Sequence, residues 1–362
     1  MTEAGAKRHT RSKLVGIQWG RGIAALLVVV CHSIAHPYPE APDFAHIMGR
    51  VGVTMFFIIS GFIMVTTTSS GEGRFDPALF MRKRITRIVP LYWSVTLLVA
   101  VLSIVVPAIF KSTPFDFGHV LTSLFFIPSY APDSLSIEPF YKLGWTLNYE
   151  MFFYVVFAGL FWMNTRVRTV TIIALFSLLF LLGLVVRSDN PAFILYTRTD
   201  ILAFAIGAAV ATFQPKGGWR LTRAVQASIV VFGLVGLALM LANYPGNQYS
   251  VGMQLAATVV CTGFVIVLAC YTSTESRPGN ALLLLGDASY AIYLFHMFAV
   301  AGTWWLVGRA GIDVTTAVRI GVMLLATAGA TVLGVAVYQW FERPIARLVG
   351  VRPAPRAAAT TP

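Results

Sequence analysis

The segment Leu14-VGIQWGRGIAALLVVVCHSI-Ala35 decides the fold, because it is long and apolar enough to span a lipid bilayer. It nevertheless contains Arg21 and His32, and ionisable groups in such a segment are costly and usually mark a functional pathway. The ten residues between them place both side chains within roughly 20° of each other around a helix and ~16 Å apart along its axis. One helix face therefore links two depths of the membrane, which suggests chemistry inside the bilayer.

The composition indicates that the whole chain is a polytopic membrane protein. Of its 362 residues, 57% are hydrophobic and 12% are charged, whereas a soluble protein averages about 25% charged residues. The formal net charge of +12 comes from cations in short segments between hydrophobic runs, which is a pattern of membrane topology and not a nucleic-acid footprint. Three cysteines lie within hydrophobic runs, with no spacing for a disulfide framework or a metal site: Cys31, Cys261 and Cys270.

The hydrophobic runs predict an all-α fold of about ten transmembrane helices. The expected spans are residues 14–36, 47–68, 88–110, 145–163, 169–187, 199–214, 224–242, 250–271, 281–307 and 315–341. The apolar stretch 117–127 is too short to cross, so we expect it at the membrane interface. A single membrane domain at 14–344 is expected to lie between a cytoplasmic basic tail at 1–13 and a disordered cytoplasmic tail at 345–362.

Positive charge sets the orientation of these spans. With the N-terminus inside, nineteen Lys and Arg residues fall in cytoplasmic segments and seven in outer segments, so both termini should be cytoplasmic. Glycines within the spans are expected to let helices pack closely, namely Gly52, Gly61, Gly207 and Gly263. The sequence shows no internal repeat, which weakens an inverted-repeat transporter interpretation.

The outer half of the predicted bundle collects groups suited to acid–base chemistry. Its histidines and carboxylates are His32, Glu150, His296 and Asp200. On the ninth span, Ser289 and Tyr293 precede His296 at helical spacing, so the three side chains form one stripe. Imidazole and carboxylate groups at this depth suit general acid–base work on a hydroxyl.

The inner half collects guanidinium groups. Arg21 lies about two turns above the cytoplasm, and Arg82, Arg84 and Arg87 cluster at the inner end of the third span. Arg84 and Arg87 are three residues apart, so they face the same way on a helix. Guanidinium groups suit phosphate recognition. A molecule with a phosphorylated handle inside and a reactive tip pointing outward fits both layers, and an acyl-CoA has that shape.

Each assignment has a structural alternative. The Arg82–Arg87 cluster also fits a positive-inside anchor, and Arg21 could snorkel to the inner interface. Glu150 also fits a helix cap, either membrane histidine fits a helix–helix hydrogen bond, and Trp145 fits the aromatic belt. Four further histidines are expected in solvated loops: His9, His36, His46 and His119.

Six segments, in order, resemble motifs of the membrane acyltransferase-3 family. They are Arg21-GIAALLVVVC-His32, Gly52-VTMFFIISGF-Ile63, Arg82-KRITRIVPLY-Trp93, Gly144-WTLNYEMFF-Tyr154, Ser289-YAIYLF-His296 and Phe341-Glu342-Arg343-Pro344. The resemblance covers nearly the whole chain, and six ordered motifs are far more specific than one apolar match. The fourth motif and the end of the third most resemble the exopolysaccharide-acetylating, ExoZ-like branch of the family.

This resemblance implies an O-acyltransferase of the bacterial inner membrane. Such an enzyme moves an acyl group, most often acetyl, from cytoplasmic acyl-CoA to a sugar hydroxyl of an exopolysaccharide or another cell-surface glycan. The family motifs assign His32 as the general base and Arg21 as its partner. They place Arg84 and Arg87 near the phosphates of the donor.

The two layers add further candidates to this site. Arg82 joins the acyl-CoA-binding arginines, and Glu150 joins His32 in catalysis by orienting its imidazole or holding the acceptor. Candidate acceptor or supporting residues are His296, Tyr293, Ser289, Asp200, Trp145 and Ser60. Acyl-CoA is expected as a co-substrate, without a resident cofactor or metal, and the expected partners are a glycan or lipid-linked sugar and membrane lipids.

Two other functions fit parts of the pattern. An O-acyltransferase of a secondary metabolite, such as a macrolide sugar, would carry the same motifs. A glycan or lipid transporter or flippase would also hold buried charge in ten spans. A transporter does not explain an inner arginine cluster paired with outer histidines and a carboxylate, and acyl transfer in detergent separates the two classes.

Overall fold

The computed structural model describes residues 14–36, 43–68, 75–108, 110, 113–215, 218–243, 250–271 and 280–348. Within them the regular secondary structure is helical, and the one isolated β-bridge joins Tyr130 to Ile137. The α-helices are α1 (Val15–Ala35), α2 (Asp43–Thr68), α3 (Pro77–Val105), α4 (Phe117–Leu124), α5 (Trp145–Gly159), α6 (Thr165–Val185), α7 (Pro191–Tyr196), α8 (Asp200–Thr212), α9 (Arg223–Ala242), α10 (Val251–Ala269), α11 (Asn280–Arg309), α12 (Thr316–Val337) and α13 (Arg343–Leu348). A 3₁₀ turn, η1 (Lys142–Gly144), precedes α5, and a π-helix, η2 (Tyr338–Glu342), joins α12 to α13.

Eight helical segments within the described residues are long and apolar enough to cross a membrane: α1, α2, α3, α6, α9, α10, α11, and α12 with its continuation to Leu348. The other two expected spans correspond to shorter helices, α5 with fifteen residues and α8 with thirteen, whereas a full crossing takes about 20. The chain is therefore an all-α polytopic membrane protein. The number of ten crossings and the cytoplasmic location of both termini stay predictions.

The third expected span begins earlier than its hydrophobicity indicates. α3 starts at Pro77 and not near residue 88, because the Asp76 carboxylate caps it by accepting from two backbone N–H groups of its first turn. The arginine cluster therefore lies on this helix, where Arg84 is buried and Arg82 is exposed.

Glycines set the closest helix contacts, as the sequence predicts. A Cβ at Gly207 would lie 2.0 Å from a carbonyl oxygen of α2, and one at Gly61 would lie 2.1 Å from a carbonyl oxygen of α8. A Cβ at Gly52 would lie 2.7 Å from a carbonyl oxygen of α1, whereas one at Gly263 would lie 3.0 Å from the Ile229 side chain of α9. Gly286, which sequence reasoning did not single out, lies where α11 approaches α1, and a Cβ there would lie 2.1 Å from a carbonyl oxygen of α1. The contacts at Gly52 and Gly286 place α1, which carries Arg21 and His32, between α2 and α11.

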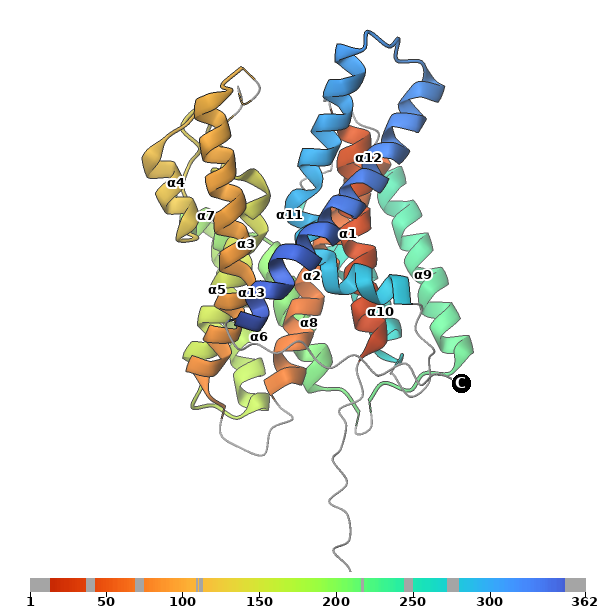
Figure 1. Ribbon diagram of the computed structural model, residues 1–362. Coiled ribbons are helices and arrows are strands. Elements are labelled where there is room, and N and C mark those ends of the chain that lie inside the picture. The colour runs from red at the N-terminus through yellow and green to blue at the C-terminus, as the bar shows by residue number, and fades with distance from the viewer. Residues whose placement is uncertain are drawn as a thin grey trace, which may run out of the picture.

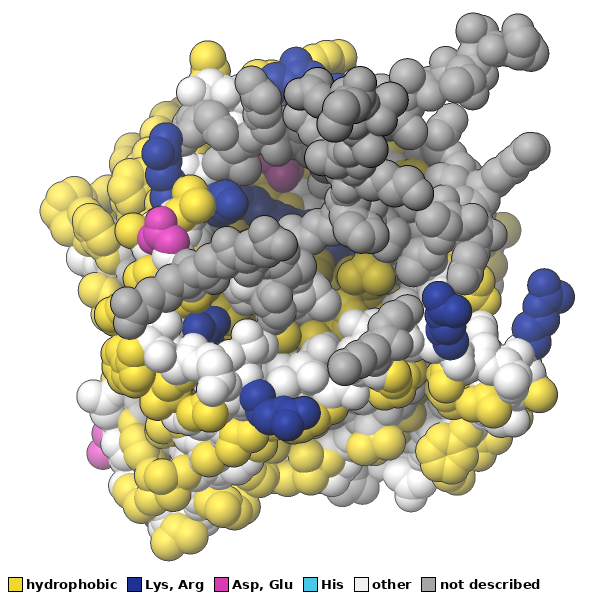
Figure 2. Space-filling model, turned by 90° about the horizontal axis from the view of Figure 1, so that it is seen from below, with side chains coloured by type: hydrophobic (Ala, Val, Ile, Leu, Met, Phe, Trp, Pro, Cys, Tyr) yellow, Lys and Arg dark blue, Asp and Glu magenta, His cyan; other side chains and the backbone are white. Residues whose placement is uncertain are grey.

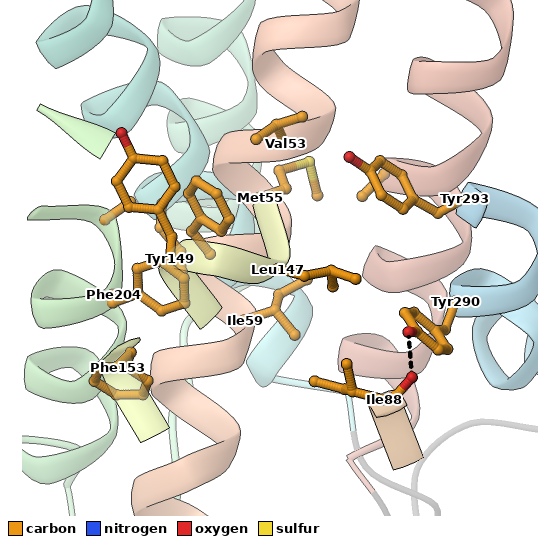
Figure 3. Packing of buried hydrophobic residues seen from close by; sticks show 14 of the residues in the cluster. Val53, Met55, Ile59, Ile88, Leu147, Tyr149, Phe153, Phe204, Tyr290 and Tyr293 are labelled. Carbon is orange, nitrogen blue, oxygen red and sulfur yellow. Dashed lines mark hydrogen bonds between the residues drawn. The ribbon is translucent and has the colours of Figure 1, made fainter. Parts of the chain in front are cut away.

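Tyrosine hydroxyls join the two sides of the bundle. Figure 1 shows α3, α4 and α5 on one side and α9 to α12 on the other. From α11, Tyr290 donates to the Ile88 carbonyl over 2.8 Å, the contact dashed in Figure 3. Tyr293 donates to the Leu143 carbonyl over 2.9 Å, and Tyr141 donates back to a carbonyl of α11. α11 therefore lies at the interface between the two sides of the bundle.

The end of the bundle that the charge pattern predicts to be cytoplasmic is rich in cations. α1, α3 and α9 begin at the lower end in Figure 1, and Figure 2 shows Lys and Arg side chains around and within a hollow on that face. Arg168, on α6, is a structural cation, because it donates to the carbonyls of Leu160 and Met163 and lies 4.1 Å from the Phe75 ring centroid. Arg168 thereby satisfies backbone oxygens at the end of α5.

One sequence prediction in the stretch around α4 is wrong. His119 was expected in a solvated loop, but it is 7% exposed and its Nδ1 lies 3.3 Å from the Ser129 hydroxyl. The apolar, capped helix carries it inward, and its burial lowers its pKa. His46 is exposed on α2, His36 is partly exposed beyond α1, and His9 lies outside the described residues.

Candidate active site

A cavity of about 70 Å³ lies among α1, α2, α3, α5 and α11. Its charged and polar lining consists of Arg21, Ser60, Arg84, Arg87, Thr146, Glu150, Tyr154, Tyr290 and Tyr293. Three of the four arginines expected to bind the donor therefore converge on one cavity. The fourth, Arg82, is exposed and is not part of its lining.

Arg21 is held between α1 and α11. Its guanidinium donates to the Gln18 side chain over 3.2 Å and to the Ser289 hydroxyl over 2.9 Å, and the residue is only 7% exposed. The Ser289 hydroxyl in turn donates to the Gly286 carbonyl, at the close contact of the two helices. Arg21 therefore points into the bundle instead of snorkelling to the interface, and Ser289 belongs to the arginine end of the α11 stripe.

Arg84 has a donor without an acceptor. Its guanidinium lies over the rings of Phe80 and Tyr154, with centroids at 5.4 Å and 5.8 Å. Its Nε is buried and has no hydrogen-bond partner. Leaving a buried donor unpaired costs about 1–3 kcal/mol, and more for a charged group. An anionic oxygen in this cavity would satisfy that nitrogen.

Glu150 lies with the arginines. Its Oε1 accepts from the Ser60 hydroxyl over 2.9 Å and from the Tyr154 hydroxyl one helical turn along α5. No hydrogen bond joins Glu150 to His32, although both residues are described, and His32 does not line the cavity. The structure therefore brings Glu150 to Arg84 and Arg87 and shows no hydrogen bond for the first of its two expected roles, which were orienting the His32 imidazole or holding the acceptor.

His32 instead lies against His296. The two ring centroids are 4.9 Å apart and the rings are tilted by 56°. His296 is fully buried, and its ring centroid lies 6.1 Å from that of Tyr293, which lines the cavity. The two histidines expected in the outer layer thus form one imidazole pair adjacent to the cavity, through Tyr293.

The remaining outer candidates lie on α5 and α8. Asp200 accepts from Arg50 on α2 over 2.8 Å, an ion pair that sequence spacing could not reveal. Trp145 packs edge-on against the rings of Phe57 and Tyr149. Figure 3 shows the aromatic packing below Tyr149. Phe57 lines the cavity, so Trp145 is one side chain removed from it.

Four polar residues in or near the cavity were not among the expected site residues: Thr146, Tyr154, Tyr290 and Glu342. Tyr154 bonds Glu150 and lies under Arg84, and its position four residues after Glu150 on a helix was the available signal. Glu342 ends the π-helix η2, has a buried oxygen without a hydrogen-bond partner, and lies within electrostatic reach of Arg87 and Arg21. π-helical turns are frequent at functional sites.

Known proteins resemble this chain along most of its length. ExoZ of Rhizobium meliloti (strain 1021), named an exopolysaccharide production protein, is 36% identical over 304 residues, which are 83% of this chain and 90% of ExoZ. MdmB of Streptomyces mycarofaciens, named an acyltransferase, is 24% identical over 392 residues, covering 96% of this chain and 94% of MdmB.

A third relative is much longer than this chain. OatA of Staphylococcus aureus (strain NCTC 8325 / PS 47), named an O-acetyltransferase, is 22% identical over 320 residues, which are 80% of this chain and 51% of OatA. No solved structure matches the chain. The acyltransferase-3 model, described as an acyltransferase domain, matches residues 14–339. With the arginine cavity and the imidazole pair lying inside that match, the chain belongs to the acyltransferase-3 family.

Proposed function

We propose that this protein is a multi-pass O-acetyltransferase of the bacterial inner membrane, with both termini in the cytoplasm. It moves an acetyl group from cytoplasmic acetyl-CoA to a sugar hydroxyl of an exopolysaccharide or another cell-surface glycan. One observation carries the proposal: a single face of α1 holds Arg21 in an arginine-lined cavity and, farther along, His32 in an imidazole pair. The name and 36% identity of ExoZ support the glycan acceptor.

The cavity supplies the donor site. Arg84 and Arg87 bind the phosphates of acetyl-CoA, because guanidinium groups bind phosphate oxygens through paired, charge-assisted hydrogen bonds. The unpaired Nε of Arg84 is one donor for such an oxygen. The pantetheine arm runs past Arg21 along α1, which brings the thioester toward His32.

The tautomer of His32 suits it to act as a base. Its Nδ1 lies 2.9 Å from the Val28 carbonyl oxygen, which only accepts, so Nδ1 carries the hydrogen. The neutral ring then has its lone pair on Nε2. This nitrogen takes the proton from the acceptor hydroxyl while the hydroxyl oxygen attacks the thioester carbonyl. The C–S bond breaks, and the proton passes to the departing CoA sulfur.

The test is transfer of radiolabel from acetyl-CoA by the purified full-length protein. The acceptor panel contains bacterial polysaccharides, lipid-linked oligosaccharides and a macrolide, with His32→Ala alongside. We expect label in a glycan with the wild type and none with His32→Ala. Wild-type transfer by a folded His32→Ala variant would exclude the general-base role.

The same panel separates the rival functions. Label in the macrolide alone would replace the glycan acceptor by a secondary metabolite. Binding of acetyl-CoA with release of neither CoA nor labelled product, by protein shown to be folded, would exclude the acetyl transfer proposed. Absence of both binding and turnover would favour the transport function.

A further inference from the structure

His296 has no role in the proposed reaction, yet its ring packs against that of His32. It lies on α11 with 0% of its surface exposed, and its ring centroid is 4.9 Å from that of His32. The pair joins the first motif of the chain to the fifth, across 264 positions of sequence between residues 32 and 296. The two helices that carry the rings, α1 and α11, pack closely at Gly286.

Both rings are fixed in the same tautomer. The Nδ1 of His296 lies 2.7 Å from the Tyr293 carbonyl oxygen, as the Nδ1 of His32 does from that of Val28. Because a carbonyl oxygen only accepts, each Nδ1 carries a hydrogen and each neutral ring has a lone pair on Nε2. The resting pair therefore holds two acceptor nitrogens and no hydrogen to share between them.

The Nε2 of His296 is buried and has no hydrogen-bond partner. Buried polar atoms are nearly always paired, so an unpaired one calls for an explanation. The Tyr293 hydroxyl, one turn earlier on α11, donates to the Leu143 carbonyl and so does not supply this nitrogen with a hydrogen. A side chain needed only for packing would not require an acceptor at this position.

We propose that His296 is a positioning residue that completes its hydrogen bonding during the reaction. This inference rests on the proposed function of His32. When the Nε2 of His32 takes the proton from the acceptor hydroxyl, the new N–H donates to the Nε2 of His296. The shared hydrogen bond stabilises the His32 imidazolium until its proton passes to the CoA sulfur, and the pair ends with the same number of protons as it began.

Two substitutions of similar size separate the two nitrogens of His296. His296→Asn places an amide near the former Nδ1 and keeps the bond to the Tyr293 carbonyl, but it removes the acceptor at the Nε2 position. His296→Gln reaches the Nε2 position with an amide oxygen that accepts and does not titrate. Both are made in the full-length protein, with kcat, the KM for acetyl-CoA and the melting temperature measured for each.

We expect His296→Asn to lower kcat by about 10- to 100-fold, the range for loss of a hydrogen bond to a charged group. Its KM for acetyl-CoA should stay within about twofold of wild type, because the arginine cavity is untouched. His296→Gln should recover at least about half of the lost activity on a logarithmic scale. Both melting temperatures should stay close to that of the wild type.

Three outcomes would overturn the inference. Unchanged kcat in His296→Asn would make the residue a packing element. Equal loss of kcat in both variants would show that the acceptor atom is irrelevant, and a change confined to KM would move His296 to substrate binding. Failure of the proposed function itself is distinguishable, because the wild type would then transfer no label.

Discussion

The arginine cavity and the imidazole pair are opposite solutions to placing polar groups in a membrane protein. Arg21, Arg84, Arg87 and Glu150 line the cavity, so groups of both charge signs share a small space, and Glu342 lies within electrostatic reach of Arg87 and Arg21. In the imidazole pair, two rings face each other without a carboxylate hydrogen-bonded to either. Charge suits binding of a charged donor, whereas neutral rings suit a proton that arrives and leaves.

The two regions also differ in which groups lack partners. The cavity holds an unpaired donor, the Nε of Arg84, and the imidazole pair holds an unpaired acceptor, the Nε2 of His296. A phosphate oxygen supplies an acceptor, and a protonated His32 supplies a donor. Each region therefore lacks the hydrogen-bond partner that its proposed role would supply. If this division is right, substitutions in the cavity should change donor binding and those in the pair should change turnover.

The largest effect on donor binding is expected from Arg84→Ala combined with Arg87→Ala. Loss of two charge-assisted hydrogen bonds of about 1.5–3 kcal/mol each should raise the KM for acetyl-CoA by about 100-fold or more. Arg82→Ala is the matched control, because Arg82 is exposed on the same helix and does not line the cavity. The division fails if the double variant changes only the KM for the acceptor.

A smaller effect should decide which region Glu150 serves. Glu150→Gln keeps an acceptor for Ser60 and Tyr154 but removes the charge beside Arg84. We expect its effect on the KM for acetyl-CoA to couple with that of Arg84→Ala by about 1 kcal/mol in a double-mutant cycle. If the effects of the two substitutions on KM were additive and Glu150→Gln mainly lowered kcat, Glu150 would be assigned to His32 and not to the donor site.

Ser289→Ala should act on stability, since Ser289 anchors Arg21 at the contact of α1 with α11. It removes the hydroxyl that accepts from Arg21, leaving a buried charged donor with only the Gln18 side chain. We expect about 1–3 kcal/mol of lost stability, measured as the urea midpoint in detergent. Ser289→Thr, which keeps the hydroxyl, is the control. Equal stability of the Ala and Thr variants would mean that Arg21 finds another partner.

Local periodicity predicted the parts of this molecule that depend on one helix at a time. The shared face of Arg21 and His32, the pairing of Arg84 with Arg87 and the glycine contacts of α2 and α8 follow from helical spacing and residue size. The early start of α3 was also readable, since Asp76 followed by Pro77 is a helix-start signal. The hydrophobic run alone placed that start too late, because the arginines interrupt it.

Contacts between distant helices were beyond such reasoning. Depth estimates placed Glu150 in the same outer half as His32 and apart from the arginines, but a small error in a helix boundary moves a side chain by several ångströms along the axis. The partner of Asp200 is Arg50, 150 positions away, and nothing in either local sequence indicates the pair. Direct contact of His32 with His296 likewise depends on how α1 packs against α11.

The smallest expected effect uses His119, a buried histidine outside the membrane-spanning helices. Burial lowers the pKa of His119, although the carboxylates of Asp116 and Glu138 oppose the shift. Below about pH 6.5 the unfolded chain binds a proton that the folded chain does not, so stability should fall as the pH falls toward the folded pKa. The loss should be under about 1.4 kcal/mol per pH unit.

His119→Gln cannot titrate, so its melting temperature should fall less than that of the wild type between pH 7 and pH 5. Parallel curves for the two proteins would mean that His119 is protonated as readily in the folded chain as in the unfolded one. Burial beside the Ser129 hydroxyl would then not be enough to keep this imidazole neutral as the pH falls.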